Sequence, residues 1–130
     1  SNYYNGITVG IDFTARDIQD LCKSKGLPWE KAKAFDNSAA VGKFVDITPG
    51  MNMKNINFSL KKNNELVQSG NSGKMIFSFD QIISHISNYF SLNIGDLIFT
   101  GTPAGVGECM VGDELELFME DKSLLKIDIK

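Results

Sequence analysis

Histidine and cysteine are scarce in this sequence of 130 residues, and their scarcity restricts the chemistry it can support. It has one histidine, His85, and two cysteines, Cys22 and Cys109. Neither cysteine has a second cysteine or a histidine at ligand spacing near it, so neither a disulfide scaffold nor a zinc site is indicated. His85 falls on the polar side of a predicted helix, with no neighbour that would make it a general base. A Ser-His-Asp or Cys-His mechanism therefore cannot be assembled from this chain.

The sequence also lacks a long apolar run and an excess of positive charge. No hydrophobic stretch approaches the roughly eighteen residues that suggest a membrane span. Thirteen basic residues against 16 acidic residues give a net charge of −3 at pH 7, and no basic stripe is present to attract a nucleic acid backbone. We therefore expect a cytoplasmic protein with reduced thiols, whose partners include neither nucleic acid nor a membrane.

What is present is the composition of one ordinary globular domain. Hydrophobic residues make up 42% of the chain and charged residues 22%, a balance that allows a single core over residues 1–130. No internal repeat, low-complexity segment or interdomain linker divides the chain. The first residues, Ser1 and Asn2, form neither an initiator nor a signal peptide, so we expect the natural chain to begin further upstream.

The first part of the chain predicts a strand followed by a helix. Apolar and β-branched residues from Ile7 to Phe13 are typical of a buried strand. Thr14-Ala15-Arg16-Asp17 has the capping and charge pattern of a helix start, and Gly26-Leu27-Pro28 ends that helix. We interpret the stretch that follows, up to Asn55, as a loop.

The second part predicts a hairpin, one more helix and three strands. Alternating segments on either side of Lys62-Asn63-Asn64 indicate a β-hairpin between Asn55 and Gly70. Apolar residues at spacings of three and four predict a helix from Phe79 to Leu92, with a capping box formed by Ser78 and Gln81. Further strands are expected at Leu97–Thr100, Glu114–Met119 and Leu124–Ile129. This order predicts a strand-rich α+β fold and argues against a doubly wound nucleotide-binding fold.

One acidic residue, Asp12, stands inside the otherwise apolar first strand. A carboxylate buried there needs a counter-charge or a cation, because an uncompensated charge in the protein interior is strongly unfavourable. The spacing favours an ion pair with Arg16 that fixes the corner between strand and helix. The alternative is that Asp12 coordinates a hard cation such as Mg²⁺, which prefers oxygen ligands. One carboxylate cannot decide between these interpretations.

A second candidate is Lys33, a basic residue among small and aromatic neighbours. A partly desolvated lysine can stabilise a developing enolate or oxyanion. A surface lysine lying over Trp29 is the more common arrangement. Lys31, two residues away, falls on a different face. The sequence leaves both interpretations of Lys33 open.

Two further features could contribute to a binding site. Closely spaced glycines in Gly101–Gly107 would let a carboxylate approach the backbone, although two consecutive turns would explain the same residues. This loop matches neither the P-loop nor the dinucleotide-binding pattern, which argues against ATP and NAD. Gln19 lies one residue from the apolar face of the first helix and could face a site, although most glutamines in such positions are solvated.

Four segments, taken together, resemble the fumarylacetoacetate hydrolase family in their order and spacing. They are residues 12–19 (DFTARDIQ), 26–35 (GLPW and AKAF), 72–78 (SGKMIFS) and 95–107 (GDLIFTGTPAGVG). The resemblance covers nearly the whole chain from Asn5 onward and looks most like the acylpyruvate hydrolase and oxaloacetate decarboxylase branch. It implies a mixed β-roll or sandwich with a few short helices, and it identifies residues 1–130 as the C-terminal portion of the family's catalytic domain.

The resemblance also implies a role for each candidate residue. Asp12 would be a ligand of Mg²⁺ or Mn²⁺, and Lys33 the catalytic lysine beside the substrate. Arg16 and Gln19 would hold the substrate or the metal shell, and Thr102 would bind a carboxylate or carbonyl oxygen of the substrate. The implied activity is metal-dependent cleavage of carbon–carbon bonds in small 2-oxo or 1,3-dioxo acids by a homodimer, in which the metal and the lysine stabilise the departing enolate.

Part of the family pattern does not occur in this sequence. The family's other metal ligands form a Glu-x-Glu pair upstream of the strand that holds Asp12, and no such pair precedes it here. Glu114-Leu115-Glu116 has the spacing but lies in the wrong part of the chain, so we expect it to be the alternating face of a strand. Two alternatives stay open: a 2-hydroxyhepta-2,4-diene-1,7-dioate isomerase/decarboxylase of aromatic degradation, and a non-catalytic binding module with an incomplete metal site.

Overall fold

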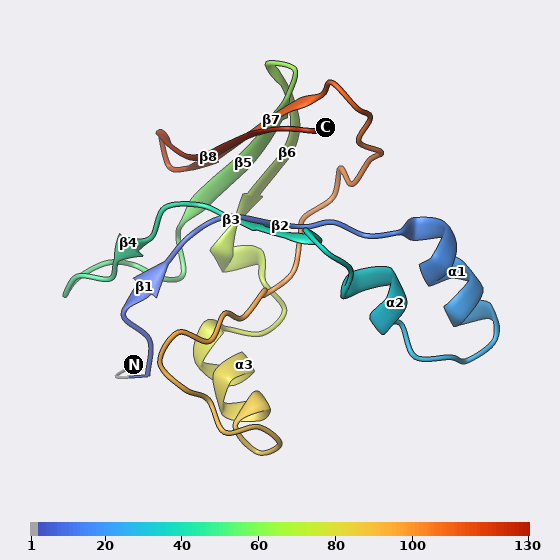
Figure 1. Cartoon of the computed structure of the whole chain (residues 1–130). Helices are drawn as coiled ribbons and strands as arrows, with labels where there is room; N and C mark the ends of the chain where they lie inside the picture. Colours follow the sequence, from blue (N-terminus) through green and yellow to red (C-terminus); the bar gives the residue numbers. More distant parts are fainter. Residues whose placement is uncertain (1–2) are drawn as a thin grey trace.

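A four-stranded antiparallel sheet is the largest element of the fold, with the strand order β6-β5-β7-β8 (Figure 1). The computed structural model describes residues 3–130, so the expectation about Ser1 and Asn2 lies outside the described residues. The strands of the sheet are β5 Asn57–Lys62, β6 Glu65–Asn71, β7 Glu114–Met119 and β8 Lys122–Asp128. The predicted hairpin and the two predicted C-terminal strands are thereby confirmed.

The hairpin between β5 and β6 turns on two asparagines. Asn63 and Asn64 have φ angles of 52° and 67°, in the left-handed region that asparagine tolerates and that tight hairpin turns require. The side chain of Asn63 also donates to Oδ1 of Asp113 at 2.8 Å and accepts from the N–H of Glu114 at 2.9 Å. These bonds join the tip of the hairpin to the start of β7.

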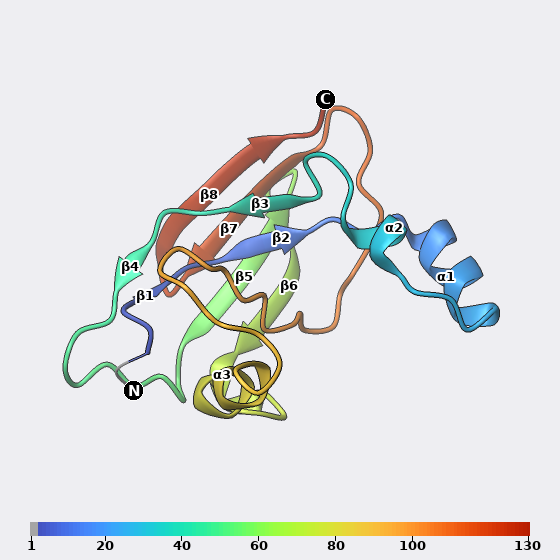
Figure 2. The same ribbon diagram turned by 60° about the horizontal axis from the view of Figure 1, so that its bottom comes forward.

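A narrower ribbon of short strands crosses one face of the sheet (Figure 2). It consists of two antiparallel pairs, β1 Gly6–Ile7 with β4 Val45–Asp46 and β2 Gly10–Asp12 with β3 Ala39–Val41. The prediction of one continuous strand from Ile7 to Phe13 is therefore wrong. Thr8 and Val9 separate two short strands, because each strand pairs with a different partner.

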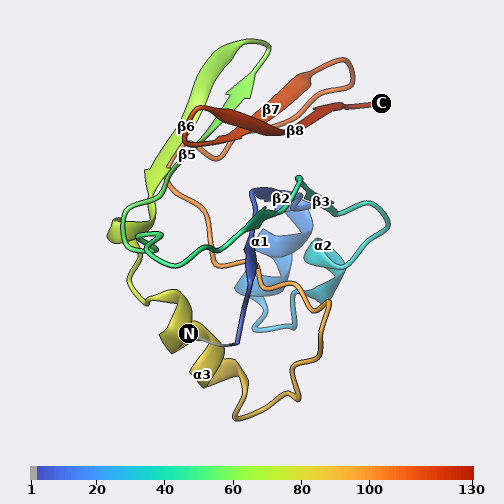
Figure 3. The ribbon, with the colours of Figure 1, turned by 90° about the vertical axis from the view of Figure 1, so that its left-hand side faces the viewer.

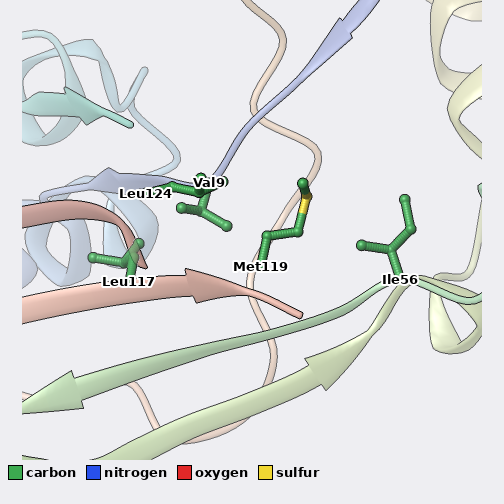
Figure 4. Packing of buried hydrophobic residues seen from close by; sticks show 5 residues of the cluster. All are labelled: Val9, Ile56, Leu117, Met119 and Leu124. Atoms are coloured by element: carbon green, nitrogen blue, oxygen red, sulfur yellow. The ribbon is translucent and has the colours of Figure 1, made fainter. Parts of the chain in front are cut away.

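The core lies where this ribbon packs against the sheet. Its buried members are Val9, Ile56, Leu117, Met119 and Leu124 (Figure 4). Leu117 and Met119 occupy alternate positions of β7, so their side chains point to the same face of the sheet. Full burial of such an apolar side chain stabilises the fold by about 1.5–3 kcal/mol. This packing anchors the ribbon and thereby places the end of β2.

Three short α-helices complete the fold. α1 Arg16–Ser24 and α2 Glu30–Lys33 connect β2 to β3 along the chain and lie side by side (Figure 3). α3 Phe79–Ile86 lies apart from them and follows a 3-10 turn, η1 Ser72–Lys74. The helix predicted after the first strand is confirmed, and Gly26, with a φ of 62°, follows its end. The loop predicted up to Asn55 is wrong, because this stretch forms α2, β3 and β4. Among the described helices, none has the length and apolar character needed to cross a membrane.

Two predicted elements differ from the structure between residues 79 and 100. α3 has the expected capping box but ends at Ile86 instead of Leu92. After Ser87 the regular α-helical pattern is lost, because the N–H groups of Asn88 and Tyr89 bond to carbonyls three residues back and only that of Phe90 bonds four residues back. Tyr89 is 73% exposed, so burial does not favour a longer helix there. The strand expected at Leu97–Thr100 is absent, because this segment pairs with no strand of the described chain.

Candidate functional site

A carboxylate and an ammonium group meet at the end of β2. Nζ of Lys33 lies 2.6 Å from Oδ2 of Asp12, and the two side chains keep 33% and 45% of their surface exposed. The structure therefore brings two predicted site residues into direct contact. It also corrects two expectations, because Asp12 is not buried and its ionic partner is Lys33, not Arg16.

Backbone hydrogen bonds hold β2 and α2 at this distance. The N–H of Phe13 donates to the carbonyl of Ser38 at 2.7 Å, and the N–H of Ala15 donates to the carbonyl of Ala32 at 3.0 Å. Ala32 has no exposed surface, so α2 packs closely at that position. Lys33 follows it directly, and its ammonium group consequently reaches the end of β2.

Thr14 completes this group, a role that the sequence pattern did not predict. Its Oγ1 accepts a hydrogen bond from Nζ of Lys33 at 2.8 Å and donates to the carbonyl oxygen of Asp12 at 3.2 Å. The predicted capping function of this segment is wrong, because the N-cap of α1 is Ala15 and no side chain caps it. A lysine ammonium has three N–H donors. Asp12 and Thr14 engage two of them, which leaves one for a ligand.

Arg16 and Gln19 form a second polar group, on α1. Nη1 of Arg16 donates to Oε1 of Gln19 at 2.7 Å, and Nζ of Lys23 donates to the same oxygen at 3.4 Å. Gln19 is only 4% exposed, so it is not a solvated glutamine. Lys23 also lies 5.6 Å from the centroid of the Trp29 ring. The lysine over Trp29 is therefore Lys23 and not Lys33.

The glycine-rich loop, Gly101–Gly107, lies against β6. Nε2 of Gln68 on β6 donates to Oγ1 of Thr102 at 3.0 Å. Gly105 has a φ of 99°, and a side chain there would collide with the carbonyl oxygen of Val67. Both contacts keep the loop close to the edge of the sheet. Within the described residues, no hydrogen bond joins Thr102 to Asp12 or Lys33, so the structure does not bring all predicted site residues into direct contact.

An ion pair holds the far end of this loop region. Nζ of Lys62 lies 2.8 Å from Oδ2 of Asp113, and the same lysine donates to the carbonyl of Glu108 at 2.8 Å. The hydrogen bond from Lys62, with those from the N–H of Met110 and from Asn63, lowers the pKa of Asp113 from 3.8 to about 2. The segment that follows the glycine-rich loop is thus tied to the hairpin.

Neither the histidine nor the cysteines add a nucleophile or base to this site. As predicted, His85 is exposed on α3. Its ring centroid lies 5.4 Å from that of Tyr89. Both thiols are free and Cys22 is buried. Burial raises the pKa of the Cys109 thiol, which disfavours the thiolate needed for nucleophilic attack.

Asp12 has the donor chemistry of a divalent cation site but supplies a single ligand. Mg²⁺ binds carboxylate oxygens and is commonly held by one or two carboxylates, with water and substrate oxygens as further ligands. In residues 3–130, no group of three or more His, Cys, Asp or Glu side chains could hold a metal ion. Asp12 therefore fits a cation only when substrate, water or other residues complete the shell.

Glu114 and Glu116 take no part in such a site. They alternate with buried Leu115 along β7, which confirms their interpretation as one face of a strand. Glu114 pairs with Lys126 at 3.0 Å, and Glu116 accepts a hydrogen bond from Ser123 at 2.6 Å.

Comparisons with known sequences agree with the resemblance. The profile of the family described as Fumarylacetoacetate (FAA) hydrolase C-terminal matches residues 1–130. The mitochondrial oxaloacetate tautomerase FAHD1 of Rattus norvegicus is 46% identical over 115 residues, which are 88% of this chain and 52% of the relative. Oxaloacetate tautomerase YcgM of Escherichia coli is 41% identical over 120 residues, which are 92% of this chain and 55% of the relative.

A solved structure shares the fold. Fumarylpyruvate hydrolase from Pseudomonas aeruginosa, in complex with Mn²⁺ and pyruvate, matches with a TM-score of 0.88 and 34% identity. The match covers 95% of this chain and 53% of the other. It confirms the predicted strand-rich fold with a few short helices. This chain spans about half the length of each of the three relatives.

Proposed function

The chain belongs to the fumarylacetoacetate hydrolase family, and from this we propose that the protein interconverts the keto and enol forms of a small 2-oxo acid, with oxaloacetate as its substrate. A mammalian and a bacterial relative are both named oxaloacetate tautomerases. The observation that carries the proposal is the position of Lys33. Its ammonium group is half-exposed beside Asp12 and Thr14 and retains one N–H for a ligand.

Enolisation of a 2-oxo acid moves one proton and one pair of electrons. The C3–H bond breaks, its proton leaves to water, its electrons form the C2=C3 double bond, and negative charge develops on O2. The remaining N–H of Lys33 donates to O2 and stabilises this charge. A proton delivered from Nζ to O2 gives the enol, and Nζ regains a proton from the water that accepted the C3 proton; conversion of enol to keto runs through the same transfers in the opposite direction. Thr14 keeps Nζ in position, because its Oγ1 accepts another of the lysine N–H groups.

Asp12 would act as a ligand of Mg²⁺ or Mn²⁺ in this reaction. Such a cation, when bound, polarises the oxygens of a 2-oxo acid. The support for a divalent metal is the carboxylate at the end of β2 together with the Pseudomonas aeruginosa hydrolase, which was solved with Mn²⁺ and pyruvate. The Asp12 carboxylate also fixes Lys33 through their ion pair.

Three further residues are proposed to hold the substrate. Thr102 would donate its hydroxyl proton to the substrate carboxylate. Arg16 and Gln19 would support the substrate or the metal shell from α1, since the Arg16 guanidinium is exposed and one of its nitrogens is held by the buried Gln19 amide. A guanidinium fixed in this way suits recognition of a carboxylate.

Hydrolytic or decarboxylating cleavage of a carbon–carbon bond is the second candidate. The similarity to fumarylpyruvate hydrolase over 95% of this chain favours it. Cleavage of the bond beyond C3 also leaves an enolate whose charge rests on O2. Lys33 would stabilise that charge as it does in enolisation, so both reactions require the same arrangement.

The test compares substrates with the complete protein in the presence of Mg²⁺ or Mn²⁺. A tautomerase accelerates the loss of enol-oxaloacetate absorbance without release of pyruvate. A hydrolase or decarboxylase releases pyruvate from fumarylpyruvate or oxaloacetate, and an isomerase converts 2-hydroxyhepta-2,4-diene-1,7-dioate. If none of these reactions is accelerated, the enzyme proposal is wrong and a binding module is the better description.

We also propose that the protein is a homodimer in the cytoplasm. Large apolar side chains are exposed along the segments that flank α3, and exposed apolar surface marks protein contacts. They are Ile76, Phe77, Tyr89, Phe90 and Ile94. Sedimentation equilibrium of the complete protein measures the oligomeric state.

Cell fractionation tests the proposed location in the cytoplasm. The rat relative is named as a mitochondrial protein, so the mitochondrial fraction is the one to compare.

A further inference from the structure

Gln68 on β6 makes three contacts with the glycine-rich loop. Its Nε2 lies 3.0 Å from Oγ1 of Thr102, 3.1 Å from the carbonyl oxygen of Pro103 and 3.5 Å from that of Ala104. Carbonyl oxygens accept hydrogen bonds and cannot donate them. The amide end that faces the loop must therefore be the NH₂ group.

The direction of these bonds determines what the Thr102 hydroxyl can do. Because Gln68 donates to Oγ1, the threonine oxygen is the acceptor in this pair. A hydroxyl has one proton of its own. That proton is consequently left to donate to a ligand on the exposed side of the loop. A carboxylate, which only accepts hydrogen bonds when ionised, is the matching ligand.

We propose that Gln68 is a positioning residue, which holds Thr102 so that its hydroxyl donates to the carboxylate of the 2-oxo acid. The inference rests on the proposed function, in which Thr102 contacts the substrate. Gln68 itself does not touch the substrate. It acts on Thr102, directly through Oγ1 and indirectly through the two neighbouring carbonyls that keep the loop against β6.

Gln68→Glu is the sharpest test, because it keeps the size of the side chain and replaces the NH₂ group by an oxygen. The new carboxylate repels the Pro103 and Ala104 carbonyls and accepts the Thr102 proton that the substrate needs. We expect the affinity for pyruvate to fall, and the KM for oxaloacetate to rise, about tenfold or more, as for the loss of one hydrogen bond to a charged group. The kcat should change much less, because Lys33 is untouched.

Ser69→Asp is the matched control. It makes the same change in charge one position along β6, where the side chain points to the opposite face. Calorimetry with pyruvate and steady-state kinetics with oxaloacetate, both on the complete metal-loaded protein, supply the readouts. Wild-type affinity in Ser69→Asp together with weakened binding in Gln68→Glu supports the inference.

Three outcomes contradict it, and they differ in what else they overturn. If Gln68→Glu and Ser69→Asp bind pyruvate with equal affinity, the role of Gln68 is overturned but the proposed function is left intact. This holds whether both variants keep the wild-type affinity or both lose it. A fall in kcat with unchanged KM does the same. A wild-type protein that neither binds pyruvate nor converts oxaloacetate overturns both proposals.

If Gln68→Glu shows no cooperative unfolding transition, it is not folded and its affinity cannot be interpreted. A double-mutant cycle then tests the same inference. Gln68→Ala and Thr102→Val are compared singly and together for pyruvate binding. If Gln68 acts through Thr102, Gln68→Ala causes no further loss in the Thr102→Val background. Additive losses would show that Gln68 acts independently of Thr102 and would overturn the inference.

Discussion

The ring of Phe99 lies against the backbone of Gly10, so close that a Cβ on Gly10 would sit 2.9 Å from its Cε1 atom. Gly10 is two positions before Asp12, and Phe99 is two positions before the glycine-rich loop. This contact therefore brings the start of that loop beside β2, the strand that ends at the Asp12–Lys33 pair. It is the packing relationship that places the two parts of the proposed site in one region.

Gly10→Ala should disturb this relationship. The added methyl group meets both the Phe99 ring and the carbonyl oxygen of Ala40, and forcing extra volume into a packed contact typically costs about 1–3 kcal/mol. We expect a lower free energy of unfolding and a higher KM, measured by chemical denaturation and by kinetics. Gly107→Ala is the control, because a Cβ there meets no atom within 4 Å. Equal stability of the two variants would rule out the packing role of Gly10.

Lys33→Ala should remove most of the activity and little of the stability. Loss of a group that donates to the developing charge typically costs about 10²–10⁴-fold in rate. The half-exposed ion pair with Asp12 contributes no more than about 1 kcal/mol. The kcat of the complete protein and its thermal unfolding midpoint provide the measurements. Lys31→Ala, which alters an exposed lysine on the same helix, should behave as wild type, and full activity in Lys33→Ala would exclude the proposed mechanism.

Asp12→Asn should weaken the binding of Mg²⁺ or Mn²⁺ by the complete protein. The substitution keeps the shape of the side chain but removes the charge that attracts a hard cation. Titration calorimetry, or the relaxation of water protons by Mn²⁺, measures the affinity. Asp36→Asn removes the same charge from an exposed turn after α2 and serves as control. Should Asp12→Asn bind the metal as tightly as Asp36→Asn, the ligand assignment is incorrect.

The stability of the protein should depend on Asp113 at acidic pH. Its pKa is lowered from 3.8 to about 2 in the folded protein, chiefly by the hydrogen bond from Lys62. A carboxyl group with a depressed pKa stabilises the fold above its unfolded pKa and loses this contribution as the pH falls through the folded value. We therefore expect Asp113 to contribute fully above about pH 4 and to lose its contribution towards pH 2.

Asp113→Asn tests this dependence. The variant should be less stable than wild type at neutral pH, and the difference between the two should shrink between pH 4 and pH 2. Denaturant unfolding at a series of pH values gives the difference directly. Asp121→Asn, which removes one negative charge from the exposed turn between β7 and β8, is the control. A constant difference between wild type and Asp113→Asn over this range would contradict the prediction.

The sequence by itself determined the features that depend on residues a few positions apart. Two adjacent asparagines specify the hairpin turn, because they tolerate positive φ. Ser78 and Gln81 specify the start of α3 through a capping box. Alternation along β7 separates buried Leu115 from Glu114 and Glu116. Each of these patterns acts within one element, so it can be recognised without knowledge of the rest of the fold.

Only the tertiary structure decided which distant groups meet. The sequence favoured Arg16 as the partner of Asp12, but the backbone bond from Ala15 to Ala32 brings α2 alongside the end of β2 and selects Lys33. The donor role of Gln68 depends in the same way on the path of a loop more than thirty residues later in the chain. Hydrogen bonds and packing between separate elements set these distances, and no local pattern encodes them.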